Sequence, residues 1–220
     1  SSMRGPTRPR TGERRIWCRR VRVSLRRAKA RCGSTVPASR RSRGPVTAAS
    51  LRAAIGLRTV VEKPQVKMLG EGVDKGVRVE KLELTVEDGL AIPALYYPGG
   101  KAARAVVFVS SFGKSGDADV LALAKAGTPV LAVDPRGMGE SYKPAGRTGY
   151  RQGYQMAARA MLLGRNLVEM QAADMLAAIS YLRGRTGLPV ALYAKGAVGP
   201  AAMFAAALEP TVSELVVERS

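Results

Sequence analysis

Three short apolar runs, separated by segments with the pattern of helices, constrain the fold of this chain more than any other feature. The runs cover residues 105–109, 129–133 and 189–194. A continuous apolar run of this length is typical of a strand buried on both faces. Helices are predicted at 118–126 and 155–163. Alternating strands and helices predict an α/β fold with a mostly parallel sheet and helices on both faces.

A hairpin is predicted ahead of the first apolar run. Apolar and polar residues alternate over 77–86, and the turn sequence Glu87-Asp88-Gly89 follows. Residues 90–97 then read as the returning strand. The domain therefore opens with an N-terminal β-hairpin.

The second half of the chain carries the signals of a long helix. Asn166, with Glu169 three residues later, predicts a capping box at its start. Gly184 and Gly187 are expected to end it. A further helix at 197–208 and a strand at 213–217 continue the strand-helix alternation.

Charge divides the chain into two parts. Residues 1–59 hold 17 Lys and Arg against a single acid, Glu13, whereas residues 60–220 hold 19 basic and 16 acidic residues. The net charge of +19 is therefore +16 for the first part and +3 for the second. Like charges without an apolar period keep a segment unfolded. We predict a disordered Arg-rich tail at 1–47 and a partial domain at 48–220.

Three interpretations of the basic tail stay open. It would bind nucleic acid through its Arg side chains, although Trp17 is its only aromatic residue for base stacking. It would serve as a targeting peptide, but not as a twin-Arg signal, because no uninterrupted apolar run follows Arg14-Arg15. Alternatively, the tail is not a functional element, because a wrongly chosen translation start would add a segment of this kind. Cys18 and Cys32 in this tail are interpreted as free thiols.

The sequence contains no His. Within this chain, that excludes a Ser-His-Asp triad, a Cys-His dyad and imidazole metal sites. With two Cys and no His, neither a metal site nor a cofactor is predicted. No run of 18 apolar residues occurs, so no membrane span is expected.

Three loops leave the carboxyl ends of the predicted strands, where ligands bind in such sheets. They begin at Ser110, Asp134 and Ala194, and the second has the pattern Asp-x-Arg-Gly-x-Gly-x-Ser. With the opening hairpin and the sequence Met161-Leu162-Leu163-Gly164-Arg165, they resemble the α/β-hydrolase superfamily. More narrowly, they resemble the acetyl xylan esterase group that includes cephalosporin C deacetylase. The resemblance covers residues 48–220 and implies hydrolysis of an acyl or carbohydrate ester.

The chain departs from this family at the positions that carry catalysis. The family's nucleophile elbow is Gly-x-Ser-x-Gly, but here Gly196 stands in the place of Ser. Ser110-Ser111 replaces the usual His-Gly of the oxyanion loop. By resemblance, the acid and the His follow later strands, beyond the last residue. We therefore expect a C-terminally truncated hydrolase with no intact catalytic residue. The backbone N–H groups of Phe112 and Ala197 would still form an oxyanion-hole-like pocket.

A second interpretation of the same turn is a dinucleotide site. Ala194-x-Gly196-x-x-Gly199 is a Rossmann phosphate motif with its first Gly replaced. Glu218, at the end of the next strand, stands where a ribose-binding acid is expected. The motif normally opens the first strand of its domain, whereas here at least four strands precede it, which disfavours this interpretation.

Other polar residues of these loops have structural explanations beside functional ones. Asp134 would close a turn or pair with Arg136. Ser141 would cap a turn rather than act as a nucleophile. Lys195 would attract an anionic substrate or be solvated. Asp174 in the long helix would bond a neighbouring loop or lie at the surface.

Two classes of function follow. One is an acetyl xylan esterase-like hydrolase that lacks its triad. The other is a non-catalytic module that binds a small ester or carbohydrate, and nucleic acid through the tail. Ending at a buried strand would leave an uncovered sheet edge, so self-association is also expected.

Overall fold

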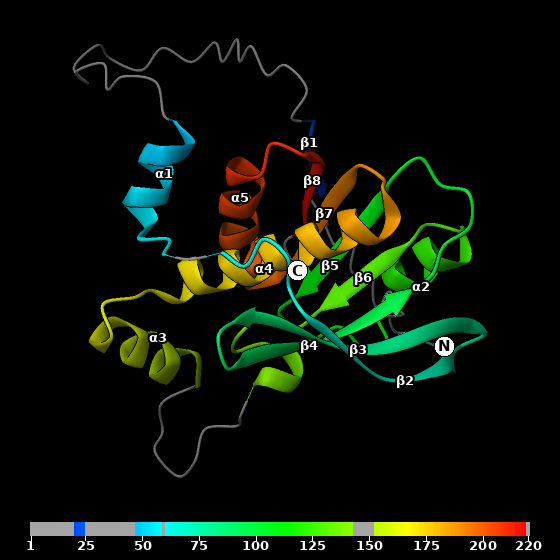
Figure 1. The fold of residues 1–220 in the computed structure, drawn as a ribbon, viewed down its shortest axis with the longest axis horizontal. Helices are drawn as coiled ribbons and strands as arrows, with labels where there is room; N and C mark the ends of the chain where they lie inside the picture. Colours follow the sequence, from blue (N-terminus) through cyan, green and yellow to red (C-terminus); the bar gives the residue numbers. More distant parts are fainter. Residues whose placement is uncertain (1–19, 25–46, 59, 143–151, 219–220) are drawn as a thin grey trace, which may run out of the picture.

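A computed structural model describes residues 20–24, 47–58, 60–142 and 152–218 of the chain (Figure 1). The described strands form one sheet in the order β1-β8-β7-β5-β6-β4-β3-β2. The strands are β1 (Arg20–Ser24), β2 (Val66–Asp74), β3 (Val77–Glu87), β4 (Leu90–Tyr97), β5 (Ala105–Ser110), β6 (Val130–Val133), β7 (Val190–Lys195) and β8 (Val212–Glu218). The helices are α1 (Ala48–Ile55), α2 (Ala118–Lys125), α3 (Gln152–Leu162), α4 (Leu167–Thr186) and α5 (Gly199–Leu208), with short 3₁₀ turns η1 (Gly139–Ser141) and η2 (Gly196–Val198).

The middle of the sheet is parallel. β5 pairs in parallel with both β6 and β7, and β7 pairs in parallel with β8. β2, β3 and β4 form an antiparallel meander that joins the parallel part through β4 and β6. The predicted α/β fold and its N-terminal hairpin are confirmed. β2 was not predicted, because its exposed apolar and charged residues follow no regular alternation.

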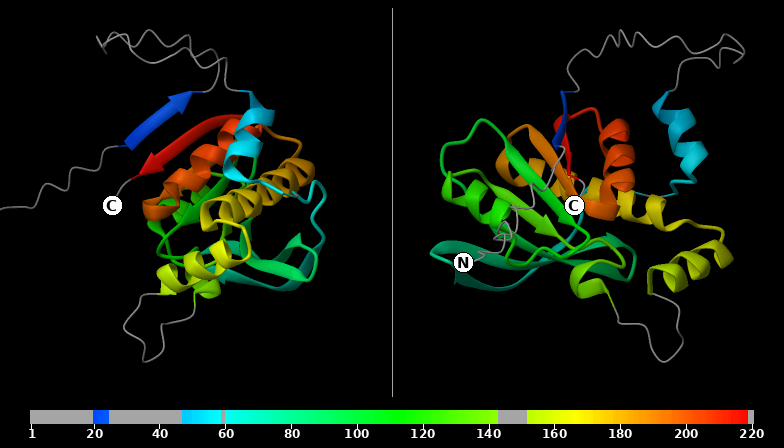
Figure 2. Two further views of the ribbon diagram at one scale, coloured as in Figure 1. Left: turned by 90° about the vertical axis from the view of Figure 1, so that its left-hand side faces the viewer. Right: turned by 180° about the vertical axis from the view of Figure 1, so that it is seen from behind.

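Helices cover both faces of the sheet (Figure 2). On one face, α4 and α5 pack on side chains from β5, β6, β7 and β8, and α1 lies against α5. On the other face, α2 packs on Phe108, Val130 and Ala132. The central strands therefore follow the three apolar runs of the sequence, except that β5 and β7 each end in one polar residue, Ser110 and Lys195.

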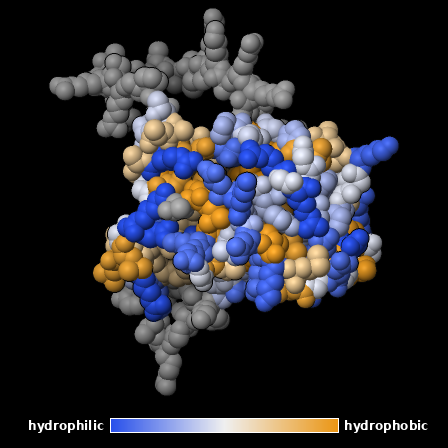
Figure 3. Space-filling model, viewed as in Figure 1, coloured by the Kyte–Doolittle hydropathy of each residue, from blue (hydrophilic) through white to orange (hydrophobic). Residues whose placement is uncertain are grey.

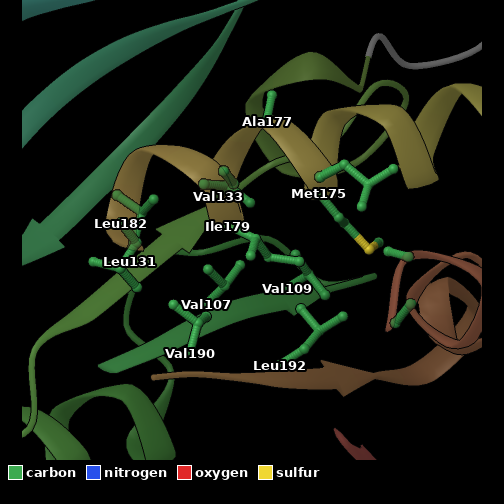
Figure 4. Close-up of a cluster of buried hydrophobic side chains, with 14 of the residues drawn as sticks. Val107, Val109, Leu131, Val133, Met175, Ala177, Ile179, Leu182, Val190 and Leu192 are labelled. Carbon is green, nitrogen blue, oxygen red and sulfur yellow. The ribbon is translucent and has the colours of Figure 1, made fainter. Parts of the chain in front are cut away.

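The larger core lies between the sheet and α4 (Figure 4). Ile179 and Leu182 of α4 are completely buried, as are Val107 of β5 and Leu192 of β7. Met175 lies nearer to α5 in the same cluster. The small Ala residues of α4 and α5 allow these two helices to approach the sheet and one another closely.

The start of α4 is only partly as predicted. The N–H of Glu169 donates to Oδ1 of Asn166 at 2.7 Å, which confirms the N-cap. The buried Glu169 carboxylate accepts instead from Arg165, so the reciprocal half of the capping box is not made. Gly184 lies within α4, and the helix ends at Gly187, whose φ of +66° forms a left-handed C-cap.

The last predicted helix is divided. Residues 196–198 form the 3₁₀ turn η2, and α5 begins at Gly199 with Pro200 in its first turn. Pro fits there because the first N–H groups of a helix have no intrahelical partner. The chain therefore changes direction through η2 after β7, and α5 begins two residues later than predicted.

The predicted disordered Arg-rich tail at 1–47 stays a prediction, but five of its residues have a described structure. Arg20–Ser24 forms β1, which pairs antiparallel with β8. β1 covers the outer edge of β8, which the sequence argument left uncovered, and self-association stays a prediction. Residues 1–19 and 25–46 of the tail, including Trp17, Cys18 and Cys32, lie outside the described residues. Among the described helices, none combines the length and apolarity that crossing a membrane requires.

Candidate functional site

A pocket of about 590 Å³ lies where β5 and β7 end. β5 leads toward α2 on one face of the sheet, whereas β7 leads into α5 on the other (Figure 1). Neighbouring parallel strands that diverge in this way open a crevice at their carboxyl ends, which is the usual ligand position in such sheets. The pocket is lined by Ser111, Phe112, Gly196, Ala197, Gly199, Pro200, Met203, Val217 and Glu218.

Gly196 forms the turn at the end of β7. Its φ of +74° lies in the left-handed region, which a side chain disfavours. A Cβ at this position would lie 2.9 Å from Ser111 Oγ and 3.2 Å from Ser111 Cβ. The chain thus keeps a sharp strand-to-helix turn, but Ser111 occupies the space into which a nucleophile at Gly196 would project.

Ser111 is fixed by the backbone of β7. Its N–H and its hydroxyl both donate to the carbonyl oxygen of Lys195, at 3.1 and 3.3 Å. The loop after β5 is therefore held directly against the turn after β7. The structure brings together Ser111, Phe112, Gly196 and Ala197 as one pocket wall, whereas Asp134 and Arg136 of the remaining predicted loop do not line this pocket.

The loop after β5 uses one of the predicted oxyanion donors itself. The N–H of Phe112 donates to the hydroxyl of the fully buried Ser110 at 3.1 Å. This N–H is therefore already engaged within the protein, and its role as an oxyanion donor stays a prediction. A role for the N–H of Ala197 stays a prediction. The ring of Phe112 is 76% exposed and lies beside the pocket.

Lys195 is neither solvated nor directed at a ligand. Its Nζ lies 3.0 Å from Asp117 and 2.8 Å from Asp119, at the start of α2. Burial lowers the pKa of Lys195, but the hydrogen bonds that its ammonium donates to Asp119 and Asp117 outweigh this effect and raise the pKa above its usual value. The ammonium ties the turn after β7 to α2.

Tyr193 extends this ion-pair cluster toward the pocket. Its hydroxyl lies 2.6 Å from carboxylate oxygens of both Asp119 and Glu218. Burial and these two carboxylates raise the pKa of Tyr193 well above its usual range, because they disfavour a phenolate. Glu218, the acid of the dinucleotide interpretation, thus accepts a hydrogen bond from the sheet.

Asp134 is paired with Lys114 and not with Arg136. Lys114 Nζ lies 2.8 Å from Asp134 and 2.6 Å from Glu140. The carboxylate of Asp134 also accepts the backbone N–H groups of Lys114 and Glu140. The expected pair with Arg136 is wrong, whereas the expectation that Asp134 closes a turn is confirmed. Sequence reasoning missed Lys114, because a Lys in a loop gives no local signal of burial.

Arg136 lies in a second buried network. Its guanidinium makes a two-pronged contact with Asp174 of α4, with nitrogen–oxygen distances of 2.8 and 3.0 Å. Asp174 also accepts the backbone N–H of Arg136, so the prediction that it bonds a neighbouring loop is confirmed. Burial raises the pKa of Asp174. The hydrogen bonds that Arg136 donates lower it, but by less, so the pKa stays above its usual value.

Glu87 joins this network to the hairpin. It accepts hydrogen bonds from Arg136 and Arg165, which outweigh its burial and lower its pKa. Ser141 ends η1, where its N–H donates to the carbonyl of Met138 in a turn. Neither Glu87 nor Ser141 lines the pocket, so these groups support the loop rather than contact a ligand.

The turn at Gly196 brings no nucleophile to the pocket. Gly196 has no side chain, and the sequence contains no His to act as a base. Within the described ranges, no cluster of three or more His, Cys, Asp or Glu side chains is arranged to hold a metal ion.

Comparisons with known proteins support the fold. The sequence matches no protein-family model and no curated protein. The structure is similar to a proposed acetyl xylan esterase from Bacteroides fragilis (TM-score 0.61, 13% identity) and to acetyl xylan esterase 1 from Thermoanaerobacterium (TM-score 0.56, 21% identity). It is also similar to an acetyl xylan esterase from Paenibacillus (TM-score 0.52, 20% identity).

These matches cover 74 to 75% of this chain but only 50 to 55% of those structures. The chain therefore spans about half the length of the esterases it resembles. At these identities the comparison establishes the fold, which is an acetyl xylan esterase-like α/β-hydrolase fold.

Proposed function

We propose that this chain is an acetyl xylan esterase-like domain that binds a small ester or carbohydrate but does not hydrolyse it through a serine nucleophile. The observation that carries the proposal is the turn at Gly196. It keeps the left-handed backbone of a strand-to-helix elbow, yet it carries no attacking group. Ser111 Oγ fills the adjacent space.

The retained pocket supports binding. Its position at the ends of β5 and β7 is the one at which this class of sheet holds ligands. Its volume of about 590 Å³ lies within the range of small-molecule sites. The contacts of Ser111 with Lys195, and of Lys195 with α2, fix both loops before a ligand arrives. A preformed pocket lowers the entropic cost of binding.

The loss of hydrolysis follows from chemistry. Acyl transfer needs a nucleophile, a base that takes its proton and donors for the oxyanion. Gly196 removes the first and the absence of His removes the usual second. The N–H of Phe112 already donates to the hydroxyl of Ser110. Binding of nucleic acid by the tail and binding of a dinucleotide at the turn stay predictions.

The experiment uses the full chain with p-nitrophenyl acetate and xylobiose. We expect at least one probe to bind in NMR titrations, while release of p-nitrophenol equals the buffer rate. Gly196→Ala should abolish binding, because its Cβ would enter the pocket beside Ser111. Gly187→Ala is the matched control, since Gly187 has a similar φ of +66° but open space around it. Turnover by the wild-type chain, or binding of neither probe, would refute the proposal.

A further inference from the structure

The side chains that line the pocket are mostly apolar. Phe112, Pro200, Met203 and Val217 provide its large surfaces, and Ala197 and two glycines provide the rest. The side-chain polar groups among the lining residues belong to Ser111 and Glu218. Both already make hydrogen bonds within the protein, to Lys195 and from Tyr193 respectively.

This composition does not suit a sugar. A carbohydrate presents many hydroxyl groups, and each one that is buried without a partner costs free energy. An apolar ligand body instead replaces water on the same surfaces with a gain that grows with the buried area. The pocket chemistry therefore favours an alkyl or aryl group over a polyhydroxylated one.

Two large apolar side chains at the pocket are exposed. Phe112 is 76% and Met203 is 56% exposed. They approach the pocket from different elements, Phe112 from the loop after β5 and Met203 from α5. An aromatic ring gives a flat contact surface, and a Met side chain adapts to the shape of its neighbour. Together they can close on a ligand from both sides.

The volume also exceeds what an acetyl group requires. Pockets of about 300 to 1,000 Å³ bury ligands of drug size, and this one measures about 590 Å³. On the basis of the proposed function, we infer that the pocket takes an uncharged ester with a medium-length alkyl or aryl body, lying between Phe112 and Met203, in preference to an acetylated sugar.

The test compares methyl hexanoate, methyl acetate and xylobiose in NMR titrations of the full chain. Each buried methylene raises affinity by about fourfold, so methyl hexanoate should bind at least about tenfold more tightly than methyl acetate even when only part of the chain is buried. Xylobiose should bind more weakly than methyl hexanoate. Binding of methyl hexanoate should show a negative heat-capacity change by calorimetry.

Variants locate the ligand. Met203→Gln and Phe112→Ser should each weaken methyl hexanoate several-fold, because each makes one wall polar. Met161→Gln is the matched control: Met161 is 72% exposed on α3 and does not line the pocket. Unchanged affinity in both pocket variants would overturn the inference, because the ligand would then lie elsewhere.

The outcomes separate this inference from the proposed function. If xylobiose binds at the pocket more tightly than methyl hexanoate, the preference for an apolar ester is refuted and the proposed function stands. If no probe binds, both fail. If methyl hexanoate binds tightly but is cleaved, the pocket assignment stands and the proposed lack of hydrolysis is refuted.

Discussion

Asp134 and Arg136 lie two positions apart after β6, yet each is held by a different element of the fold. Asp134 accepts a hydrogen bond from Nζ of Lys114, in the loop after β5, at 2.8 Å. Arg136 contacts Asp174 of α4 at 2.8 Å. All four side chains are buried. The short loop after β6 is therefore held by the loop after β5 through Asp134 and by α4 through Arg136.

The Asp134–Lys114 pair should contribute strongly to stability. Asp134→Ala removes a carboxylate that is 1% exposed and leaves Lys114, which is 2% exposed, with Glu140 as its charged partner among the described residues. Breaking a buried ion pair on one side costs about 3 to 5 kcal/mol. We expect a loss of this size in urea unfolding. Asp88→Ala, at the exposed hairpin turn, is the control and should change stability by less than about 0.5 kcal/mol. Equal stability of the two variants would contradict the assignment.

Arg136 should not tolerate replacement by Lys. A Lys keeps the charge but cannot reproduce the two-pronged contact with Asp174 and the contact with Glu87. Loss of one charged hydrogen bond costs about 1.5 to 3 kcal/mol. Thermal and urea unfolding should show this loss for Arg136→Lys. The same change at the exposed Arg159 should have little effect. A wild-type unfolding midpoint in Arg136→Lys would show that charge alone is sufficient.

Restoring the nucleophile alone should not restore esterase activity. Gly196→Ser supplies a hydroxyl, but the sequence has no His to take its proton. The new side chain would also lie against Ser111, so Gly196→Ser combined with Ser111→Gly is the necessary second variant. Both should hydrolyse p-nitrophenyl acetate no faster than the wild-type chain. Clear turnover by the double variant would reveal a different base in the pocket.

The ion-pair cluster at Lys195 predicts a loss of stability at high pH. The pKa values of Lys195 and Tyr193 are both raised above their usual 10.5 and 10.0, so the folded chain keeps protons that the unfolded chain releases. The stabilisation is complete below these usual values and is lost as the pH rises through the folded-state values.

Urea unfolding between about pH 8 and about pH 11 measures this loss. Lys195→Met and Tyr193→Phe should each reduce the dependence of unfolding free energy on pH in this range. Lys125→Met, in the last turn of α2 and with no ion pair among the described residues, is the control. If neither Lys195→Met nor Tyr193→Phe changes how the free energy of unfolding depends on pH, the pKa values of these two groups are not raised in the folded chain.

The strands of the buried sheet could be predicted because their signal is local. Residues 105–109 are apolar at every position, and the structure buries each of them from both faces. The alternation over 77–86 likewise predicted β3. β1 could not be predicted, since its five residues lie in a strongly basic segment and gain their structure only by pairing with β8. The edge strand β2 similarly depends on β3.

Within the site, the sequence by itself determined which groups are missing. The glycine at position 196 and the absence of His are read directly from the sequence, and a side chain that the sequence does not contain cannot take part in the site. The sequence also placed the turn at the end of a buried strand, since the apolar run up to Ala194 stops there.

Only the tertiary structure decided which partners the remaining polar groups take. Lys195 forms ion pairs with Asp117 and Asp119, and Asp134 forms one with Lys114. Ser111 fills the space beside Gly196. Each contact joins loops that are far apart in the sequence and meet because parallel strands end at the same edge of the sheet. Such contacts depend on burial and on distances of a few ångströms, which no local pattern of residues records.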